Sequence, residues 1–547
     1  MNNEFEVLAK KMEGDLFVDD VNKILYSTDA SAYKETPVAI ARPKNKNDLQ
    51  ELINFARTNK TFLIPRTAGT SLAGQVVGGG IIVDVSKYFT EIIEINEQEH
   101  WVRVQPGVIL DELNNELKSY GLFFAPETST SNRCMLGGMG GNNSCGAHSL
   151  IYGSTREHLL EVKALLSNGE EVAFSEIDTD EFEEKCKQNN LEGRIYKKFN
   201  DVLNDTEVQK EIKDQFPDPI LERRNTGYAI DILLDSKPFT ENAPKFNMSK
   251  LLAGSEGTLA LTTELKLNLV PLPPKEKALI CIHHETLEES FQANIVALRH
   301  QPDAIELMDK IILDCTKTNI EHLKNRFFVK GDPGAILCIE FSRENREELD
   351  IITDKLIWEI TNAGFGYHYP VLYGDDIKKV WALRKAGLGL LSNLPGDAKP
   401  APVIEDTSVN PNQLPEYLKE FRKILNKYKL ECVYYGHIAT GELHLRPVLN
   451  LKDPHDVELF HSIALDVAHL VKKYNGSLSG EHGDGRLRGE FIPLMLGDRI
   501  YDIFKDIKHT WDPNEIFNRG KIVDTPKMNT FLRYKPGQKT RNIKTIF

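Results

Sequence analysis

Three glycine-rich segments, each expected to follow a strand, constrain the fold of this chain more than any other feature. The densest is LGGMGGNNSCG (136–146), with five glycines, and the others are PRTAGTSLAG (65–74) and AGSEGT (253–258). Glycine permits a positive φ and lets the backbone approach a neighbour closely, so such loops often hold phosphate groups. A tight bend between strands is the alternative for each segment.

The two common nucleotide motifs are absent. GxGxxG fails at every offset in the central segment, and the only Gly-Lys pair, Gly520-Lys521, is followed by Ile522 rather than by Ser or Thr. Several loops that meet at one ligand suit a long cofactor with many acceptor atoms. Together the segments predict a dinucleotide site without a Rossmann fingerprint.

Charge and cysteine content exclude several classes of protein. The 547 residues include 81 acidic and 67 basic side chains, a net charge of −14, which disfavours nucleic acid as a partner. The seven cysteines form no CxxC pair, so a disulfide scaffold, a Cys-based zinc site and an internal iron–sulfur cluster are not predicted. No segment approaches the roughly 18 apolar residues of a membrane helix, and the N-terminus does not resemble a signal peptide. We expect a cytoplasmic protein with at most peripheral association at the inner face of the membrane.

Short strands alternate with helices, which predicts an α+β protein of at least two domains. The first domain is expected at 35–270 and ends at the proline cluster VPLPP, residues 270–274. The second is expected at 275–510 and contains a clear helix that Asp453 caps and Asn475-Gly476 ends. Residues 1–34 are an N-terminal segment, and 511–547 are a C-terminal segment that returns to the first domain.

The glycine-rich segments also resemble a known family. PRTAGTSLAG, the GGMxxNNSxG loop with the following YGSTREH, and GSEGTL are similar to the FAD-binding domain of the vanillyl-alcohol oxidase and p-cresol methylhydroxylase superfamily. The resemblance implies a two-part FAD-binding domain of the p-cresol methylhydroxylase type and a C-terminal α+β cap domain that binds the substrate. The residues that it implies as cofactor contacts are Pro65, Arg66, Thr67, Ala68, Gly69, Thr70, Ser71, Pro126, Thr128, Gly138, Met139, Asn143, Ser144, Gly146, Tyr152, Gly153, Glu256, Gly257 and Asn518.

The resemblance also bears on how FAD is held. Members with a covalent histidyl flavin typically have a histidine in the pyrophosphate loop, whereas Thr70 stands near that place here. We therefore expect noncovalent FAD, and His148 is the remaining candidate for attachment.

Histidines and a carboxylate in the second domain are candidate metal ligands. His437 and His444 are seven residues apart, and Glu481 precedes His482 in SGEHGDG. Imidazole and carboxylate suit a divalent Zn, Mn or Fe ion, and three protein ligands leave a position open for a substrate. The spacing alone also fits ordinary hydrogen-bonding histidines.

GHxxxGxLHxRP together with SGEHGDGRxR resembles the C-terminal domain of the D-2-hydroxy-acid dehydrogenases, which act on D-lactate, D-2-hydroxyglutarate and glycolate. The resemblance spans about residues 20–535. It implies His437, His444 and Glu481 as metal ligands and His482 as the base. The hydroxyglutarate enzymes commonly show GDGNLHLN, whereas this chain has Ala439, Glu442 and Arg446 in that stretch, so the resemblance does not identify the substrate.

A helix at 377–384 is expected to supply a cation. Ile377, Val380, Trp381 and Arg384 fall on one face, which turns the guanidinium toward the apolar side. An inward arginine needs an anion, either a substrate carboxylate or an acidic side chain of the protein. The match to the family's WxxR implies that Arg384 binds the substrate. Arg446, Arg486 and Arg488 are weaker candidates, because arginines in charged loops are usually solvated.

These parts predict an FAD-dependent dehydrogenase that oxidises a D-2-hydroxy acid, D-lactate-like, to the 2-oxo acid. His482, with an ordinary pKa near 6.5, would take the hydroxyl proton while a hydride passes to flavin N5. One alternative is a non-redox, FAD-containing synthase of the alkyl-glycerone-phosphate type. Another is a flavin-free, metal-dependent hydrolase that uses the same ligands.

The C-terminal region carries a prediction about partners. Residues 518–537 resemble the junction, in long relatives, where the flavoprotein half precedes an iron–sulfur half. Because this sequence has no cysteine run to carry electrons onward, we expect an iron–sulfur partner, as a separate subunit or as a C-terminal domain.

Overall fold

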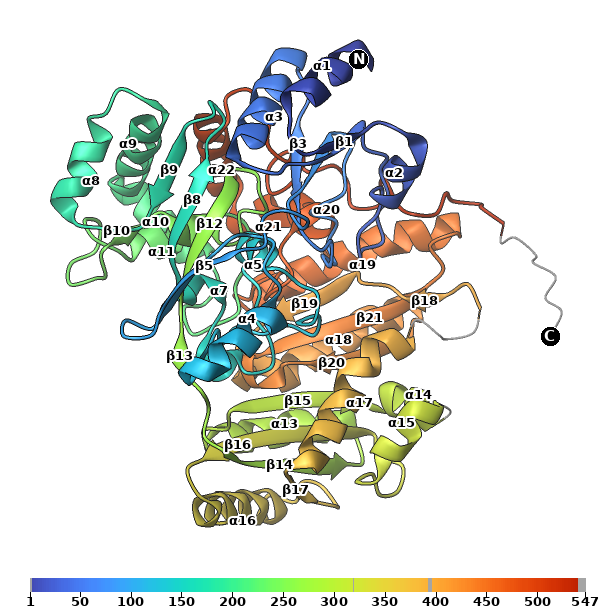
Figure 1. The fold of residues 1–547 in the computed structure, drawn as a ribbon. Helices are drawn as coiled ribbons and strands as arrows, with labels where there is room; N and C mark the ends of the chain where they lie inside the picture. Colours follow the sequence, from blue (N-terminus) through green and yellow to red (C-terminus); the bar gives the residue numbers. More distant parts are fainter. Residues whose placement is uncertain (1, 318, 392–395, 540–547) are drawn as a thin grey trace.

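The computed structural model describes residues 2–317, 319–391 and 396–539 (Figure 1). Two larger sheets form the N-terminal part, in the strand orders β1-β2-β4-β3 and β5-β6-β12-β8-β9, and β10-β11 and β13-β7 form two-stranded sheets. The strands of this part are β1 (Asp15–Phe17), β2 (Ala39–Arg42), β3 (Leu63–Arg66), β4 (Ile81–Asp84), β5 (Ile92–Asn96), β6 (Trp101–Val104), β7 (Leu122–Phe123), β8 (Leu159–Leu165), β9 (Glu171–Phe174), β10 (Glu176–Ile177), β11 (Phe246–Asn247), β12 (Leu261–Asn268) and β13 (Val270–Pro271).

Helices surround these two sheets. They are α1 (Asn2–Lys11), α2 (Asp20–Leu25), α3 (Lys46–Asn59), α4 (Leu110–Leu117), α5 (Leu136–Asn142), α6 (Ser149–Tyr152), α7 (Thr155–His158), α8 (Thr179–Cys186), α9 (Leu191–Leu203), α10 (Thr206–Gln215), α11 (Ile230–Leu234) and α12 (Ser249–Leu252). Helix α3 begins where the Asn45 side chain accepts a hydrogen bond from Asp48 N, and it buries Leu49 and Leu52, as its periodicity predicts.

The second part is built on one larger sheet in the order β17-β14-β16-β15-β20-β21-β18, with β19 also paired to β21. Its strands are β14 (Glu276–His284), β15 (Ala304–Asp309), β16 (Ala335–Arg343), β17 (Val371–Tyr373), β18 (Lys399–Pro400), β19 (Ile404–Ser408), β20 (Cys432–Gly436) and β21 (Glu442–Leu449). Its helices are α13 (Leu287–Leu298), α14 (Lys310–Lys317), α15 (Ile320–Leu323), α16 (Arg346–Asn362), α17 (Asp375–Leu391), α18 (Leu414–Tyr428) and α19 (Pro454–Lys473). Among the described residues, short 3-10 helices cover Lys118–Tyr120, Lys324–Arg326, Pro411–Gln413, Ile438–Thr440 and Gly489–Phe491.

Helices bury both faces of this second sheet. Along β14, Leu279 and Cys281 join a core with α14 and α17, whereas Ile280 and Ile282 face the core that contains residues of α13 and α16. Successive side chains of a strand point to opposite faces, so a strand with two covered faces reads as a continuous apolar run. Both faces of the sheet are therefore buried, and the polar side chains on β15 and β21 are held within the fold.

Contacts with the N-terminal part are already present before residue 511, the predicted start of the C-terminal segment. Gly485 N already donates to Glu256, and Arg486 N donates to Ala73 O. Helices α20 (Gly485–Arg488), α21 (Ile492–Leu496) and α22 (Asp498–Trp511) follow, and Trp511 of α22 packs on Phe174 of β9. In Figure 1, α22 accordingly lies among the elements of the first part.

The central glycine-rich segment is a short helix rather than an open loop. Helix α5 covers most of it and ends at Asn143, which adopts a left-handed conformation with φ +56°. Asp453 caps α19 as predicted, since its side chain accepts from His455 N.

Candidate active site

A cavity of about 1020 Å³ lies where the glycine-rich segments face the second sheet. Its volume is at the upper end of the roughly 300–1,000 Å³ of ordinary small-molecule sites. Many predicted residues line it, namely Pro65, Arg66, Thr67, Ala68, Gly69, Thr70, Ser71, Thr128, Gly138, Met139, Ser144, Gly146, Glu256, Gly257, Arg384, His437, His444, Glu481 and His482. The structure therefore brings the predicted cofactor segments and the predicted catalytic residues to one space.

Five predicted cofactor contacts do not line the cavity, namely Pro126, Asn143, Tyr152, Gly153 and Asn518. Asn143 and Asn518 act behind it. Asn143 Oδ1 accepts from Arg156 N and from Ser154 Oγ, and Asn518 Nδ2 donates to the carbonyls of Gln75 and Glu256. Asn518 thus joins two cavity-lining residues, and Asn143 joins the end of α5 to α7.

Some glycines allow the segments to pack closely, and others expose backbone to the cavity. A Cβ on Gly138 would lie 2.5 Å from Thr67 Oγ1, and a Cβ on Gly257 would lie 2.8 Å from Pro65 Cγ, so the segments pack directly on one another. Gly141 differs, because it lines the cavity and a Cβ there would meet no atom within 4 Å. Backbone exposed in this way fits an extended cofactor held by N–H groups.

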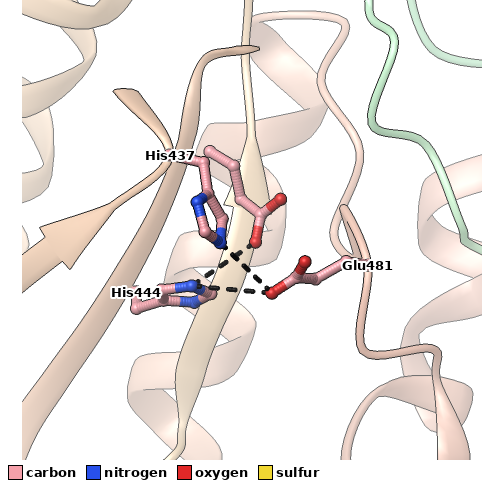
Figure 2. A group of neighbouring side chains, drawn as sticks. His437, His444 and Glu481 are labelled. Atoms are coloured by element: carbon pink, nitrogen blue, oxygen red, sulfur yellow. Dashed lines mark ion pairs between the residues drawn. The ribbon is translucent and has the colours of Figure 1, made fainter. Parts of the chain in front are cut away.

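Side chains from two strands and one loop form the candidate metal cluster (Figure 2). His437 follows β20, His444 lies on β21, and Glu481 lies in the loop after α19. Oε1 of Glu481 is 3.6 Å from Nε2 of His437 and 3.7 Å from Nε2 of His444. Atoms bound tetrahedrally to Zn²⁺ at about 2.1 Å would be about 3.4 Å apart. The three predicted ligands thus have a spacing that fits a small cation.

Glu442 adds a carboxylate that the sequence analysis did not assign. It offers a ligand atom within 4.8 Å of those of the other three, and its Oε1 is buried without a hydrogen-bond partner among the described residues. Glu442, His444 and Arg446 alternate along β21, so they share one face of the strand. This alternation along the strand is the sequence pattern that could have placed Glu442 beside His444.

The surroundings shift the pKa values of the two candidate histidine ligands in opposite directions. Burial alone would lower the pKa of His437, but Glu306 and Glu481 raise it to about 9. Burial, together with the nearby His482, holds the pKa of His444 well below its ordinary value. His444 is therefore neutral, the form in which imidazole binds a metal.

Glu306 connects the cluster to the predicted substrate arginine. Its Oε1 lies 2.5 Å from Nδ1 of His437, and its Oε2 lies 2.7 Å from Nη2 of Arg384. A carboxylate behind a histidine fixes the tautomer and leaves Nε2 facing the cluster. Arg384 thus lines the cavity but already has a protein carboxylate as a partner, which was the alternative to substrate binding.

Arg223 holds the cluster from the N-terminal part. Its side chain is 1% exposed and donates from Nη1 to Glu442 and to Glu481, from Nη2 to Gly146 O, and from Nε to Ser149 Oγ. One guanidinium therefore links two carboxylates of the cluster to the loop after α5. No sequence signal distinguished Arg223 from other arginines.

His482 lies among three carboxylates. Nδ1 is 3.1 Å from Oε1 of Glu405 and 3.8 Å from Asp406, and Nε2 is 3.1 Å from Oε1 of Glu481. Burial would lower the pKa of His482, but these charges raise it well above the ordinary 6.5 that the sequence analysis used. At neutral pH the ring therefore keeps its proton unless one of these charges is offset.

The three weaker arginine candidates are buried rather than solvated. Arg446 pairs with Glu405, Arg486 pairs with Glu35, and Arg488 donates to the carbonyls of Gly483 and Glu405. All three guanidinium groups therefore bind carboxylate or carbonyl groups of the protein itself.

A strained residue fixes the loop that carries Glu481 and His482. Asp406 has φ +90°, and its carboxylate accepts from Glu481 N at 2.7 Å, His482 N at 3.0 Å and Ser479 Oγ at 2.6 Å. Backbone strain of this kind persists only where surrounding contacts enforce it. Asp406 therefore sets the position of both predicted functional side chains.

Comparison with solved structures defines the fold. p-Cresol methylhydroxylase matches with a TM-score of 0.67 at 12% identity, covering 95% of this chain and 96% of that one. An alkyldihydroxyacetonephosphate synthase matches with a TM-score of 0.61 at 15% identity, covering 95% and 84%. The predicted α+β class with a p-cresol methylhydroxylase-type FAD domain is confirmed.

Two protein-family models match parts of the chain. Residues 37–175 match the FAD binding domain, and residues 273–522 match the C-terminal domain of FAD linked oxidases. The chain therefore carries both domains of an FAD-linked oxidase.

Two relatives extend along nearly the whole chain. D-2-hydroxyglutarate dehydrogenase of Pseudomonas putida is 34% identical over 521 residues, which are 93% of this chain and 50% of that protein. A glycolate oxidase subunit of Bacillus subtilis is 24% identical over 92% of this chain and 93% of its own length. The chain thus spans about half the length of the hydroxyglutarate dehydrogenases that it matches.

Across the described residues, every helix is too short or too polar to cross a bilayer.

Proposed function

We propose that this chain is an FAD-dependent dehydrogenase that oxidises a D-2-hydroxy acid to the 2-oxo acid. The observation that carries the proposal is that the glycine-rich segments, the His437–His444–Glu481 cluster, His482 and Arg384 line one cavity. Relatives named for D-2-hydroxyglutarate and glycolate support a small 2-hydroxy acid as the substrate class.

In this proposal each side chain has a separate task. Arg384 turns a guanidinium toward the cavity and orients the substrate carboxylate, for which a planar fork is suited. His482 removes the hydroxyl proton, and Glu405 at Nδ1 balances the charge that the ring gains. When bound, FAD would accept the hydride from C2 of the substrate. When bound, a divalent cation at His437, His444 and Glu481 would lower the pKa of the substrate hydroxyl and offset the charge of Glu481.

Anaerobic addition of a panel of D-2-hydroxy acids to the purified protein tests the proposal. The matching acid should bleach the flavin absorbance, because only a dehydrogenase transfers two electrons to it. A synthase of the alkyldihydroxyacetonephosphate type, whose solved member shares the fold, would keep its flavin oxidised. A flavin-free hydrolase would show no flavin absorbance. Either result would refute the dehydrogenase.

We propose that the FAD is noncovalent. Both ring nitrogens of His148, the remaining candidate for attachment, are taken by the carboxylates of Glu127 and Glu340. We also propose a divalent metal ion. The cluster of His437, Glu442, His444 and Glu481, with two imidazoles and two carboxylates, suits Zn²⁺, Mn²⁺ or Fe²⁺.

We propose further that an iron–sulfur subunit or domain receives the electrons. The relatives that are about twice as long, and the relative named as a subunit, support a partner. The chain would then work in the cytoplasm, with at most peripheral contact at the inner face of the membrane. The purified chain should reduce an artificial dye much faster than oxygen; equal rates would make the partner unnecessary.

A further inference from the structure

A charged network outside the metal cluster joins the two parts of the chain. His148 follows the cavity-lining residues Gly146 and Ala147. Its Nδ1 lies 2.6 Å from Oε1 of Glu127, and its Nε2 lies 3.0 Å from Oε1 of Glu340. Glu127 belongs to the N-terminal part, whereas Glu340 lies on β16 of the second part and is 1% exposed. One imidazole therefore bridges the two parts beside the cavity.

Glu340 is also an anchor for helix α17. Its Oε2 accepts from Trp381 Nε1 at 2.7 Å, and its Oε1 accepts from Lys277 Nζ at 2.7 Å. Trp381 and Arg384 are three positions apart on α17, so they share a face, and both line the cavity. Any shift of Trp381 would therefore carry Arg384 with it.

We propose that His148 is a positioning residue that holds helix α17, and with it Arg384, at a fixed place relative to the loop after α5. This inference rests on the proposed function, which assigns the substrate carboxylate to Arg384. His148 itself is expected to touch neither substrate nor flavin, because both of its ring nitrogens are taken.

The charge states of the network agree with its geometry. Burial alone would lower the pKa of His148, but Glu127 and Glu340 raise it to about 10. Burial would raise the pKa values of both carboxyls, but His148 and the nearby lysines hold each at about 2. Lys277, Lys385 and Asp303 are the other charged groups that face this network. At neutral pH the bridge is thus an imidazolium between two carboxylates.

Kinetics of the FAD-loaded full chain test the proposal. In His148→Gln, the KM of the hydroxy acid that bleaches the flavin should rise on the order of tenfold, since a clamp displaced by a fraction of an ångström binds poorly. The kcat and the FAD content should stay within about twofold, as expected when ground-state and transition-state binding weaken equally. The control is His158→Gln, a histidine whose Nε2 contacts Tyr152 O within the N-terminal part; the KM of this variant should not change.

A double-mutant cycle separates positioning from general destabilisation. If His148 acts through Arg384, His148→Gln should raise KM no further in an Arg384→Ala background. Fully additive effects would overturn the proposal. Trp381→Phe keeps an aromatic side chain but replaces the indole and removes its N–H to Glu340, so it should also raise KM even if His148→Gln folds poorly.

A measurement without substrate keeps this inference separate from the proposed function. Peptides covering α17 should exchange their amide hydrogens faster in His148→Gln than in the wild type, while peptides of β8 and β12 should not change. Unchanged exchange of α17 would overturn the positioning role whether or not any hydroxy acid is oxidised. Faster exchange without flavin bleaching would refute the proposed function alone.

Discussion

Replacing Glu405 by glutamine tests the proposed proton transfer most directly. Glu405 lies on β19, is 1% exposed, and places Oε1 3.1 Å from Nδ1 of His482. Glutamine keeps the size of the side chain and an acceptor oxygen, but it cannot balance an imidazolium. Close pairs of opposite charge are coupled by about 1.5 kcal/mol or more, so kcat should fall at least roughly 10-fold. Loss of the base itself, in His482→Ala, should cost about 10²- to 10⁴-fold.

The assay is the rate of anaerobic flavin reduction in a stopped-flow instrument, with the FAD content measured on the same sample. Asp309→Asn is a matched control, because Asp309 is a buried carboxylate of the same sheet that accepts from Ile312 N and Tyr434 N away from the cavity. It should leave the rate of flavin reduction unchanged. The reasoning fails if Glu405→Gln reduces flavin at the wild-type rate, or if it slows the His482→Ala variant by the same factor.

Four further results are expected. Acid precipitation should release the yellow colour into the supernatant, and colour that stays in the pellet would show covalent flavin. Chelation should abolish turnover and leave FAD bound, because the candidate ligands lie beyond residue 430 and the cofactor segments before 260; full activity after verified metal removal would disprove the metal role. Arg384→Lys should raise KM without changing flavin content, since lysine cannot reproduce the bidentate fork; an unchanged KM would leave Arg384 as a partner of Glu306 only. The pKa of His148 is raised from 6.5 to about 10. Protonated His148 therefore stabilises the folded protein fully below pH 6.5, and this contribution is lost as the pH rises to about 10. The melting temperatures of wild type and His148→Gln should therefore converge between pH 6.5 and 10, and a constant difference would contradict the assigned pKa.

Local sequence patterns predicted the features that depend on residues close together in the chain, namely individual helices and short motifs. The apolar spacing of Leu49, Leu52 and Ile53 predicted α3, and Asp453 predicted the start of α19. The glycine-rich segments and the paired histidine motifs pointed to the FAD domain and to a cluster at 437–444 and 481. The two helix predictions are confirmed because helix periodicity and capping depend on residues within a few positions of each other.

Only the tertiary structure determined the protonation and the position of the predicted site side chains. Glu306, Glu405 and Arg223 come from segments far from the histidine motifs, yet their side chains set the tautomer, the protonation and the position of the predicted ligands and base. Arg384 could pair with substrate or with any acid in the sequence, and the sheet register placed Glu306 beside it. Such contacts depend on which strands lie next to each other and on burial from water, and both follow from long-range packing rather than from neighbouring residues.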